Sequence, residues 1–111
     1  METRTCESVH NPWSGEKLAE ICVAGAGDVE SAVASSHEAF QQTRRLTADA
    51  RASTLEKIHH LIFDRRQEFV DVIVAEAGKP VTYAEAEVVR AALTFRFAAA
   101  LALADEGHGI N

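Results

Sequence analysis

The sequence lacks a surplus of basic residues and lacks any long apolar run. Its 111 residues hold 11 Lys and Arg against 17 Asp and Glu, which gives a formal net charge of −6. Binding of nucleic acid or of anionic lipid needs a basic face, so both partner classes are disfavoured. The longest apolar run, Phe97 to Ala104, has eight residues and is too short to cross a membrane. We therefore expect neither nucleic acid nor a membrane as a partner.

Cysteine is scarce, and the N-terminal segment carries no apolar signal core. Cys6 and Cys22 match neither a C-x-x-C pair nor a zinc-binding spacing. Residues 1–7 are polar, unlike a secretory signal, which predicts a cytoplasmic protein whose cysteines stay reduced. Neither cysteine has a neighbouring base or helix N-terminus that would activate its thiol. We expect two small apolar strand residues rather than a nucleophile.

The common catalytic motifs are also missing, including G-x-S-x-G and H-E-x-x-H. Gly25-x-Gly27 lacks the third glycine of a dinucleotide loop and the lysine of a P-loop, so we interpret it as a strand-to-helix turn. A weak anion site at the following helix N-terminus stays open. His59 and His60 point about 100° apart on a helix and cannot chelate one metal ion. The residues alone predict no catalytic, cofactor-binding or metal-binding site.

The sequence does carry a hairpin pattern at its N-terminal end. Residues 5–10 and 17–23 are rich in β-prone side chains, and Asn11–Gly15 between them has turn composition. Two registers fit, one pairing Cys6 with Ile21 and the other pairing Cys6 with Glu20. Neither places the two cysteines directly opposite each other, so we predict that they are not joined by a disulfide.

Apolar residues at helical spacing predict three or four helices after the hairpin. The expected ranges are about 29–44 with Asp28 as N-cap, 48–77 after Thr47 with a possible break near 64–67, and 82–105 from a capping box at Thr82. Gly78 and Pro80 predict the stop before the last helix, and Gly107 and Gly109 predict its end. Twenty alanines support the helical majority. The predicted class is mostly α with an N-terminal β-hairpin.

Four short sequence motifs follow one another along nearly the whole chain, from about Val9 to about Gly109. They are Asn11-Pro12-x-Ser14-Gly15-Glu16 with Asp28-Val29, Arg51-x-x-x-Leu55-x-x-Ile58, Glu76-Ala77-Gly78-Lys79-Pro80, and Ala84-x-x-Glu87-Val88 with Thr94-Phe95-Arg96-Phe97-Ala98-Ala99. In this order and spacing they resemble the N-terminal part of the aldehyde dehydrogenase superfamily. The last motif, together with Thr43-Arg44-Arg45-Leu46, is most similar to those of lactaldehyde, phosphonoacetaldehyde and non-phosphorylating glyceraldehyde-3-phosphate dehydrogenases.

The resemblance implies that residues 1–111 are the N-terminal portion of the cofactor-binding domain of a larger α/β enzyme. Such enzymes oxidise an aldehyde with NAD or NADP through a thiohemiacetal on a cysteine. Their nucleophile, glutamate base and oxyanion-hole asparagine lie beyond the position matching Asn111, and Cys6 and Cys22 match strand positions. We therefore expect a scaffold segment that is inactive and binds no cofactor alone. Its partners would be the rest of the enzyme or a second copy, through exposed apolar helix faces.

The sequence leaves a structural cation site and an alternative function open. Some family members seat a structural monovalent cation on carbonyls and a carboxylate whose matching positions are Val9, His10 and Glu87, although a helix pair between Glu87 and Arg90 is the simpler interpretation. The alternative function is a small helical protein–protein interaction module or a gene remnant.

Overall fold

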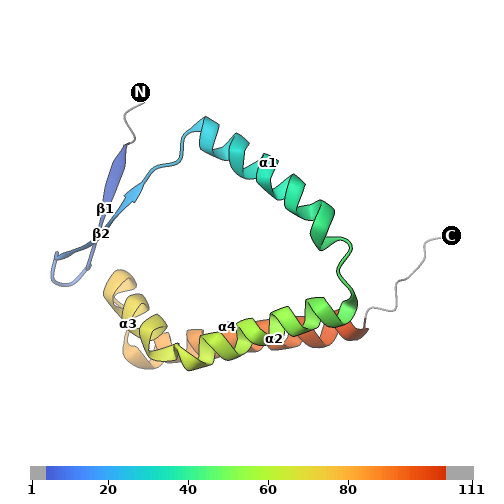
Figure 1. The fold of residues 1–111 in the computed structure, drawn as a ribbon. Helices are drawn as coiled ribbons and strands as arrows, with labels where there is room; N and C mark the ends of the chain where they lie inside the picture. Colours follow the sequence, from blue (N-terminus) through green and yellow to red (C-terminus); the bar gives the residue numbers. More distant parts are fainter. Residues whose placement is uncertain (1–4, 105–111) are drawn as a thin grey trace. The chain divides into compact units, whose positions relative to one another are not determined.

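The computed structural model describes residues 5–104, and these divide into two compact units, each described here by itself. In chain order the elements are β1 (Cys6–His10), β2 (Lys17–Cys22), α1 (Ala26–Thr43), α2 (Ala48–Asp64), α3 (Arg66–Ala77) and α4 (Val81–Ala104). The first unit holds β1, β2, α1, the last three residues of α3 and Gly78. The second unit holds α2, the rest of α3, and α4; Figure 1 labels these elements. The predicted class, a hairpin followed by helices, is confirmed.

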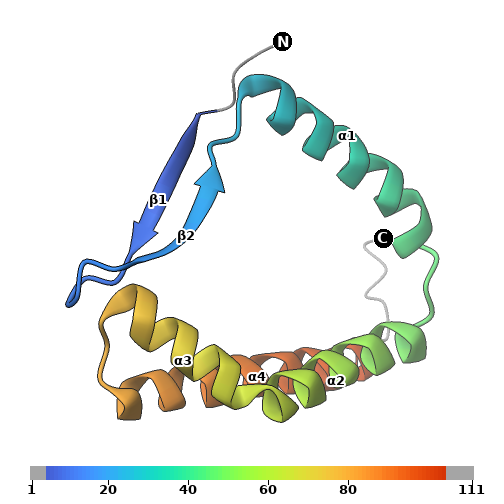
Figure 2. The same ribbon diagram turned by 60° about the vertical axis from the view of Figure 1, so that its left-hand side comes forward.

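The strands β1 and β2 pair antiparallel (Figure 2). In this register Cys6 lies directly opposite Cys22. Both predicted registers are therefore wrong. The ladder is irregular between Val9 and His10, because Val9 pairs with Ala19 whereas His10 pairs with Lys17. Leu18 is thus an extra residue, and this bulge shifts all pairs beyond it by one position. Without it Cys6 would face Ile21, as the first predicted register had it.

Helix α1 begins at Ala26, earlier than the predicted start near residue 29. Gly25 is the N-cap, and Asp28 lies at the third helical position, where its Oδ2 accepts a 3.0 Å hydrogen bond from the Gly25 backbone N–H. The prediction of Asp28 as N-cap is therefore wrong by three positions, because its carboxylate reaches back to the cap from inside the first turn. The apolar side chains Val29, Val33 and Phe40 are all more than half exposed.

The possible break in the second predicted helix is real and falls at Arg65. Thr47 caps α2 as predicted, since its Oγ1 accepts from the Ala50 N–H at 3.2 Å. Arg65 leaves helical geometry with φ −102° and ψ 17°, and α3 starts at the next residue. Gly78 then takes φ +63°, which confirms its predicted role in stopping the helix.

Helix α4 begins at Val81, so the predicted capping box at Thr82 is wrong. The carbonyl of Pro80 instead accepts from the backbone N–H groups of Tyr83 and Ala84, at 3.0 and 3.1 Å. Proline suits this boundary because its fixed φ stops one element and admits the next. The predicted helix end at residue 105 and the glycines 107 and 109 lie outside the described residues.

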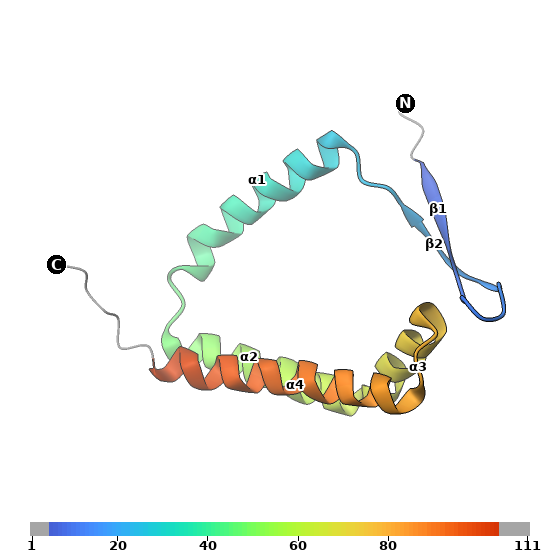
Figure 3. The ribbon, with the colours of Figure 1, turned by 180° about the vertical axis from the view of Figure 1, so that it is seen from behind.

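The core lies in the second unit, where α2 and α4 run antiparallel and side by side (Figure 3). Among the described residues the buried side chains are Ala52, His59, Val70, Ala84, Val88, Ala92 and Ala99. Four of them are alanines, which lets the helix backbones approach closely. Val70, Ala84 and Val88 form one cluster, against which Ile62, Ile73 and Val74 pack. None of the helices described here is long and apolar enough to span a membrane.

Candidate functional site

The N-terminus of α1 does not fit a phosphate or a dinucleotide. An anion at this end of a helix would be held by the first backbone N–H groups. The carboxylate of Asp28 already sits there and accepts from the Gly25 N–H, while the Asp28 N–H itself donates to the Gly25 carbonyl at 3.1 Å. An incoming phosphate would meet a negative side chain. The sequence predicted a strand-to-helix turn at Gly25-x-Gly27, but only Gly25 precedes the helix, as its N-cap, and Gly27 lies in the first turn of α1.

The adjacent histidines serve two separate purposes, as their helical positions predicted. His59 is buried between α2 and α4, and its Nδ1 lies 2.8 Å from the carbonyl oxygen of Ala92. Because a carbonyl can only accept, that nitrogen carries the proton. His60 is exposed, with Nε2 3.6 Å from Oε1 of Glu56. Within residues 5–104, no group of three or more His, Cys, Asp or Glu side chains could hold a metal ion.

Glu87 on α4 is held by two basic side chains. Lys79 Nζ donates to its Oε1 at 2.5 Å, and Arg90 Nη2 lies 3.9 Å from the same oxygen. The hydrogen bond from Lys79 lowers the pKa of the Glu87 carboxyl below its ordinary value. The predicted contact with Arg90 is present, but Lys79, eight positions earlier, is the closer partner. Sequence reasoning missed it because Lys79 precedes α4 and so shares no helix face with Glu87.

The cation site suggested for Val9, His10 and Glu87 stays a prediction. His10 Nδ1 lies 3.0 Å from the Gly15 carbonyl oxygen within the hairpin. The carboxylate of Glu87 already has the ammonium group of Lys79 as its positive partner. His10 belongs to the first unit and Glu87 to the second.

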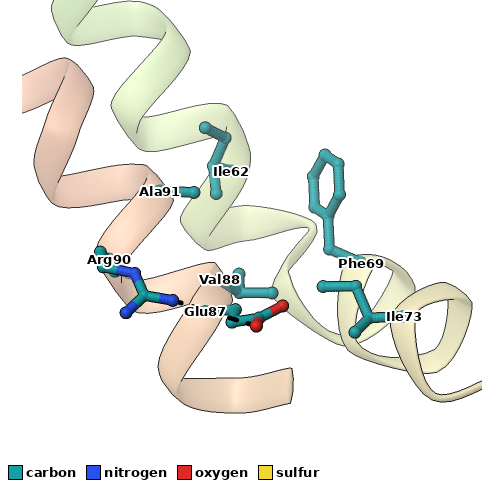
Figure 4. A pocket seen from close by; sticks show the side chains of 7 residues that line it. All are labelled: Ile62, Phe69, Ile73, Glu87, Val88, Arg90 and Ala91. Carbon is teal, nitrogen blue, oxygen red and sulfur yellow. Dashed lines mark ion pairs between the residues drawn. The ribbon is translucent and has the colours of Figure 1, made fainter. Parts of the chain in front are cut away.

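An apolar groove of about 300 Å³ opens between the helices of the second unit (Figure 4). Its lining residues are Ile62 of α2, Phe69 and Ile73 of α3, and Glu87, Val88, Arg90 and Ala91 of α4. Figure 4 draws Glu87 and Arg90 as an ion pair on α4, beside the apolar side chains. The groove offers no nucleophile and no histidine. Its chemistry suits contact with an apolar side chain rather than a reaction.

The two cysteines form a close pair that sequence reasoning did not anticipate. Their Sγ atoms lie 3.5 Å apart on directly opposed strand positions, both residues are exposed, and no disulfide joins them. The hydrogen bond with Cys22 is the main cause that raises the pKa of the Cys6 thiol above its ordinary value. The bulge at Leu18 creates this pairing, and no strong sequence signal marks that bulge.

Comparisons with known proteins agree on one family. The model of the aldehyde dehydrogenase family matches residues 1–111. Malonate-semialdehyde dehydrogenase of Bacillus pumilus (strain SAFR-032) is 36% identical over 98 residues, which are 88% of this chain and 20% of that enzyme. 3-Sulfolactaldehyde dehydrogenase of Pseudomonas putida is 36% identical over 81 residues, covering 73% of this chain and 17% of that enzyme.

A solved structure shows the same fold. The NAD-dependent benzaldehyde dehydrogenase from Corynebacterium glutamicum superposes with a TM-score of 0.89 at 21% sequence identity, covering 96% of this chain and 24% of that one. The chain therefore spans about a fifth of the length of the curated relatives it matches and about a quarter of this structure.

Proposed function

Because the chain belongs to the aldehyde dehydrogenase family, we propose that it forms the N-terminal scaffold of an enzyme that oxidises an aldehyde to a carboxylate with NAD or NADP. The chain matches about a fifth of such an enzyme, and its described residues, 5–104, form a hairpin and four helices. Its role is to support the parts that bind the cofactor and perform the chemistry.

The observation that carries this proposal is the number of large apolar side chains left exposed. In the first unit no described side chain is buried, although α1 alone carries Val29, Val33 and Phe40 on one face. In the second unit, Phe69 and Ile73 border an open apolar groove. Apolar faces of this kind favour a covering partner. The covering partner in this proposal is the remainder of the enzyme.

The chain by itself supplies no catalytic or cofactor-binding residue under this proposal. The two thiols face each other across an exposed hairpin. The first turn of α1 presents the Asp28 carboxylate where a pyrophosphate would need backbone N–H groups. The 111-residue chain is therefore expected to be inactive alone, and NAD or NADP chemistry belongs to the enzyme as a whole.

The names of the relatives support a proposal for the substrate class of the whole enzyme. Three similar enzymes are named for malonate semialdehyde, succinate semialdehyde and 3-sulfolactaldehyde, which are short aldehydes that carry an acidic group. The branch suggested by the Thr94–Ala99 motif stays a prediction; of its aldehydes, phosphonoacetaldehyde and glyceraldehyde-3-phosphate are acidic and lactaldehyde is not. The whole enzyme is proposed to take a short anionic aldehyde and to work in the cytoplasm.

A chimera tests the scaffold role. The segment of the Bacillus pumilus enzyme that matches this chain is replaced by the chain itself, and oxidation of malonate semialdehyde is measured. We expect a folded chimera with activity, because the reacting groups come from the recipient. The isolated chain, titrated with NAD and NADP in a calorimeter, should show no saturable binding. Micromolar binding by the isolated chain would contradict the proposal.

A matched pair of variants in the chimera tests whether the apolar face of α1 is covered. Val33 lies on that face, whereas the exposed Ser35 lies on the opposite side of the helix. Val33→Glu should lower the melting temperature or the yield of the active chimera, and Ser35→Glu should leave both unchanged. Equal behaviour of the two variants would show that nothing covers α1.

A further inference from the structure

The pairing of the two cysteines has a specific geometry within the hairpin. The Val23 N–H donates to the Thr5 carbonyl at 2.9 Å, which makes Thr5 and Val23 a hydrogen-bonded pair of the antiparallel ladder. Hydrogen-bonded and non-hydrogen-bonded pairs alternate, so the next pair, Cys6 and Cys22, is non-hydrogen-bonded. At such pairs the Cα atoms lie about 4.5 Å apart and the side chains approach most closely. A disulfide spans about 4.4–6.8 Å between Cα atoms, so this backbone can accept one.

The thiols are close to each other and open to reagents. Their Sγ atoms lie 3.5 Å apart, and both residues are exposed at the open end of the hairpin. The hydrogen bond with Cys22 raises the pKa of the Cys6 thiol and so lowers its thiolate fraction, which makes its attack on an oxidant slower than that of an activated cysteine. A third ligand of the Cys, His, Asp or Glu type, which a metal site would need, is not grouped with them among residues 5–104.

From this geometry we propose that Cys6 and Cys22 are a reversible redox site, which a peroxide or a low-mass disulfide converts into a cross-strand disulfide. With a peroxide, one thiolate attacks an oxygen, the O–O bond breaks, a sulfenic acid forms, and the departing hydroxide takes the thiol proton as water. The second thiol then attacks the sulfenic sulfur, the S–S bond forms and a second water leaves. The two sulfurs lose two electrons, and the peroxide gains them. With a low-mass disulfide, one thiolate attacks a sulfur of that disulfide, its S–S bond breaks and one low-mass thiol leaves; the second protein thiol then displaces the other low-mass thiol, so the reagent gains the two electrons.

The disulfide would stabilise the hairpin, which has no buried side chains of its own among the described residues. None of the described side chains in the first unit is buried, and an isolated two-stranded hairpin is marginal in water. The bond would join residues 16 positions apart at the end of β2 that leads into α1. Covalent links of this kind stabilise elements that lack a sufficient apolar core. Oxidation would thus turn a loose hairpin into a closed one.

The purified 111-residue chain is treated with a small excess of hydrogen peroxide, or of oxidised glutathione, and digested with trypsin without reductant. Trypsin cuts after Lys17, between the two cysteines, so the 5–17 and 18–44 peptides stay together only if the bond exists. We expect the linked pair as the main product, a monomer on a non-reducing gel, and recovery of both reactive thiols with dithiothreitol. Disulfide-linked dimers or sulfinic acid as the main product would overturn the proposal.

A matched control variant keeps two thiols in the hairpin but places the thiol of β2 on the opposite face of the strand pair. In the double variant Cys22→Ser, Ile21→Cys the thiols are nearly as close in sequence, yet neighbouring strand residues point to opposite faces. The intramolecular bond should form at least about tenfold faster in the native chain than in this variant, because only the native pair is aligned for attack. Equal rates would show that chain flexibility rather than strand register brings the sulfurs together, and would also overturn the proposal.

Discussion

The indole Nε1 of Trp13 donates a 2.9 Å hydrogen bond to the carbonyl oxygen of Gly78, 65 positions later in the chain. The contact joins the hairpin turn to the turn that ends α3, both within the first unit. Gly78 has φ +63°, and a Cβ at this position would lie 2.5 Å from Trp13 Nε1 and 2.8 Å from Pro12 Cγ. Glycine is thus required here both for the backbone conformation and for the closeness of the turn.

Replacing Gly78 with alanine should destabilise this contact. Left-handed backbone strain and the clash with Trp13 together should cost about 1–3 kcal/mol of unfolding free energy. Trp13 is the single tryptophan, so its fluorescence emission reports the contact directly. Gly15→Ala, at φ +74° with open space around it, should show the strain alone, and Gly27→Ala in α1 should be neutral or stabilising. A Gly78→Ala emission spectrum and stability equal to those of the Gly27→Ala chain would contradict this account.

Truncating Val88 should weaken the core of the second unit. Val88 is 4% exposed in the cluster with Val70 and Ala84, so Val88→Ala removes two buried methyl groups and leaves a cavity. We expect a loss of about 2 kcal/mol in urea unfolding followed by circular dichroism. Val89, the next residue on α4, is 43% exposed, and Val89→Ala should change the free energy by less than about 0.5 kcal/mol. Equal losses for the two variants would place the core elsewhere.

Replacing His59 should weaken the packing of α2 against α4 and lower the unfolding free energy. Its Nδ1–H donates to the Ala92 carbonyl in a buried position, so His59→Phe replaces a paired polar group with one that cannot donate. The expected loss is about 1–2 kcal/mol of unfolding free energy. His60→Ala removes an exposed contact with Glu56 and an edge-on ring contact with His59, 5.1 Å between the ring centroids, and should cost less than His59→Phe. If His60→Ala were the more harmful variant, the assignment of the buried histidine would be wrong.

The Lys79–Glu87 pair should make the stability of the fold depend on pH in the acid range. The Glu87 pKa is lowered in the folded chain, so the pair stabilises the fold above the ordinary glutamate pKa, and this contribution is lost as pH falls through the lowered value. Lys79→Met should raise the Glu87 pKa toward its ordinary range in a carbon-detected nuclear magnetic resonance titration. Lys57→Met, a change at an exposed lysine on α2, should leave the Glu87 titration unchanged. An unaltered Glu87 titration in the Lys79 variant would exclude Lys79 as its partner.

The isolated chain should self-associate through its apolar faces. Val29, Val33 and Phe40 are exposed on one side of α1, so a second copy can cover what the rest of the enzyme is proposed to cover. Sedimentation at several concentrations should show oligomers, and Val33→Glu should weaken them at least about tenfold, because a buried charge costs more than 1.4 kcal/mol. Ser35→Glu is the control. A monomer with a sharp, concentration-independent unfolding transition would instead favour an independent helical module.

Local sequence signals were sufficient for most of the secondary structure. Thr47 as N-cap, Gly78 as a left-handed stop and the apolar spacing of α2 and α4 depend on neighbours a few positions away. The motifs that carry the family resemblance are also short and local. The comparisons confirm the family. The start of α1 was missed by three residues because an aspartate can cap from inside the first turn as well as from before it.

Tertiary structure alone decided the pairings between distant residues. A bulge at Leu18 placed Cys6 opposite Cys22, and a one-residue slip costs little in a strand pair whose two faces are both exposed. Lys79 reached Glu87, and His59 reached Ala92, because the chain turns between elements and brings residues together that share no local pattern. Periodicity determines which face of a helix is apolar, but the partner of that face depends on how the chain folds back upon itself.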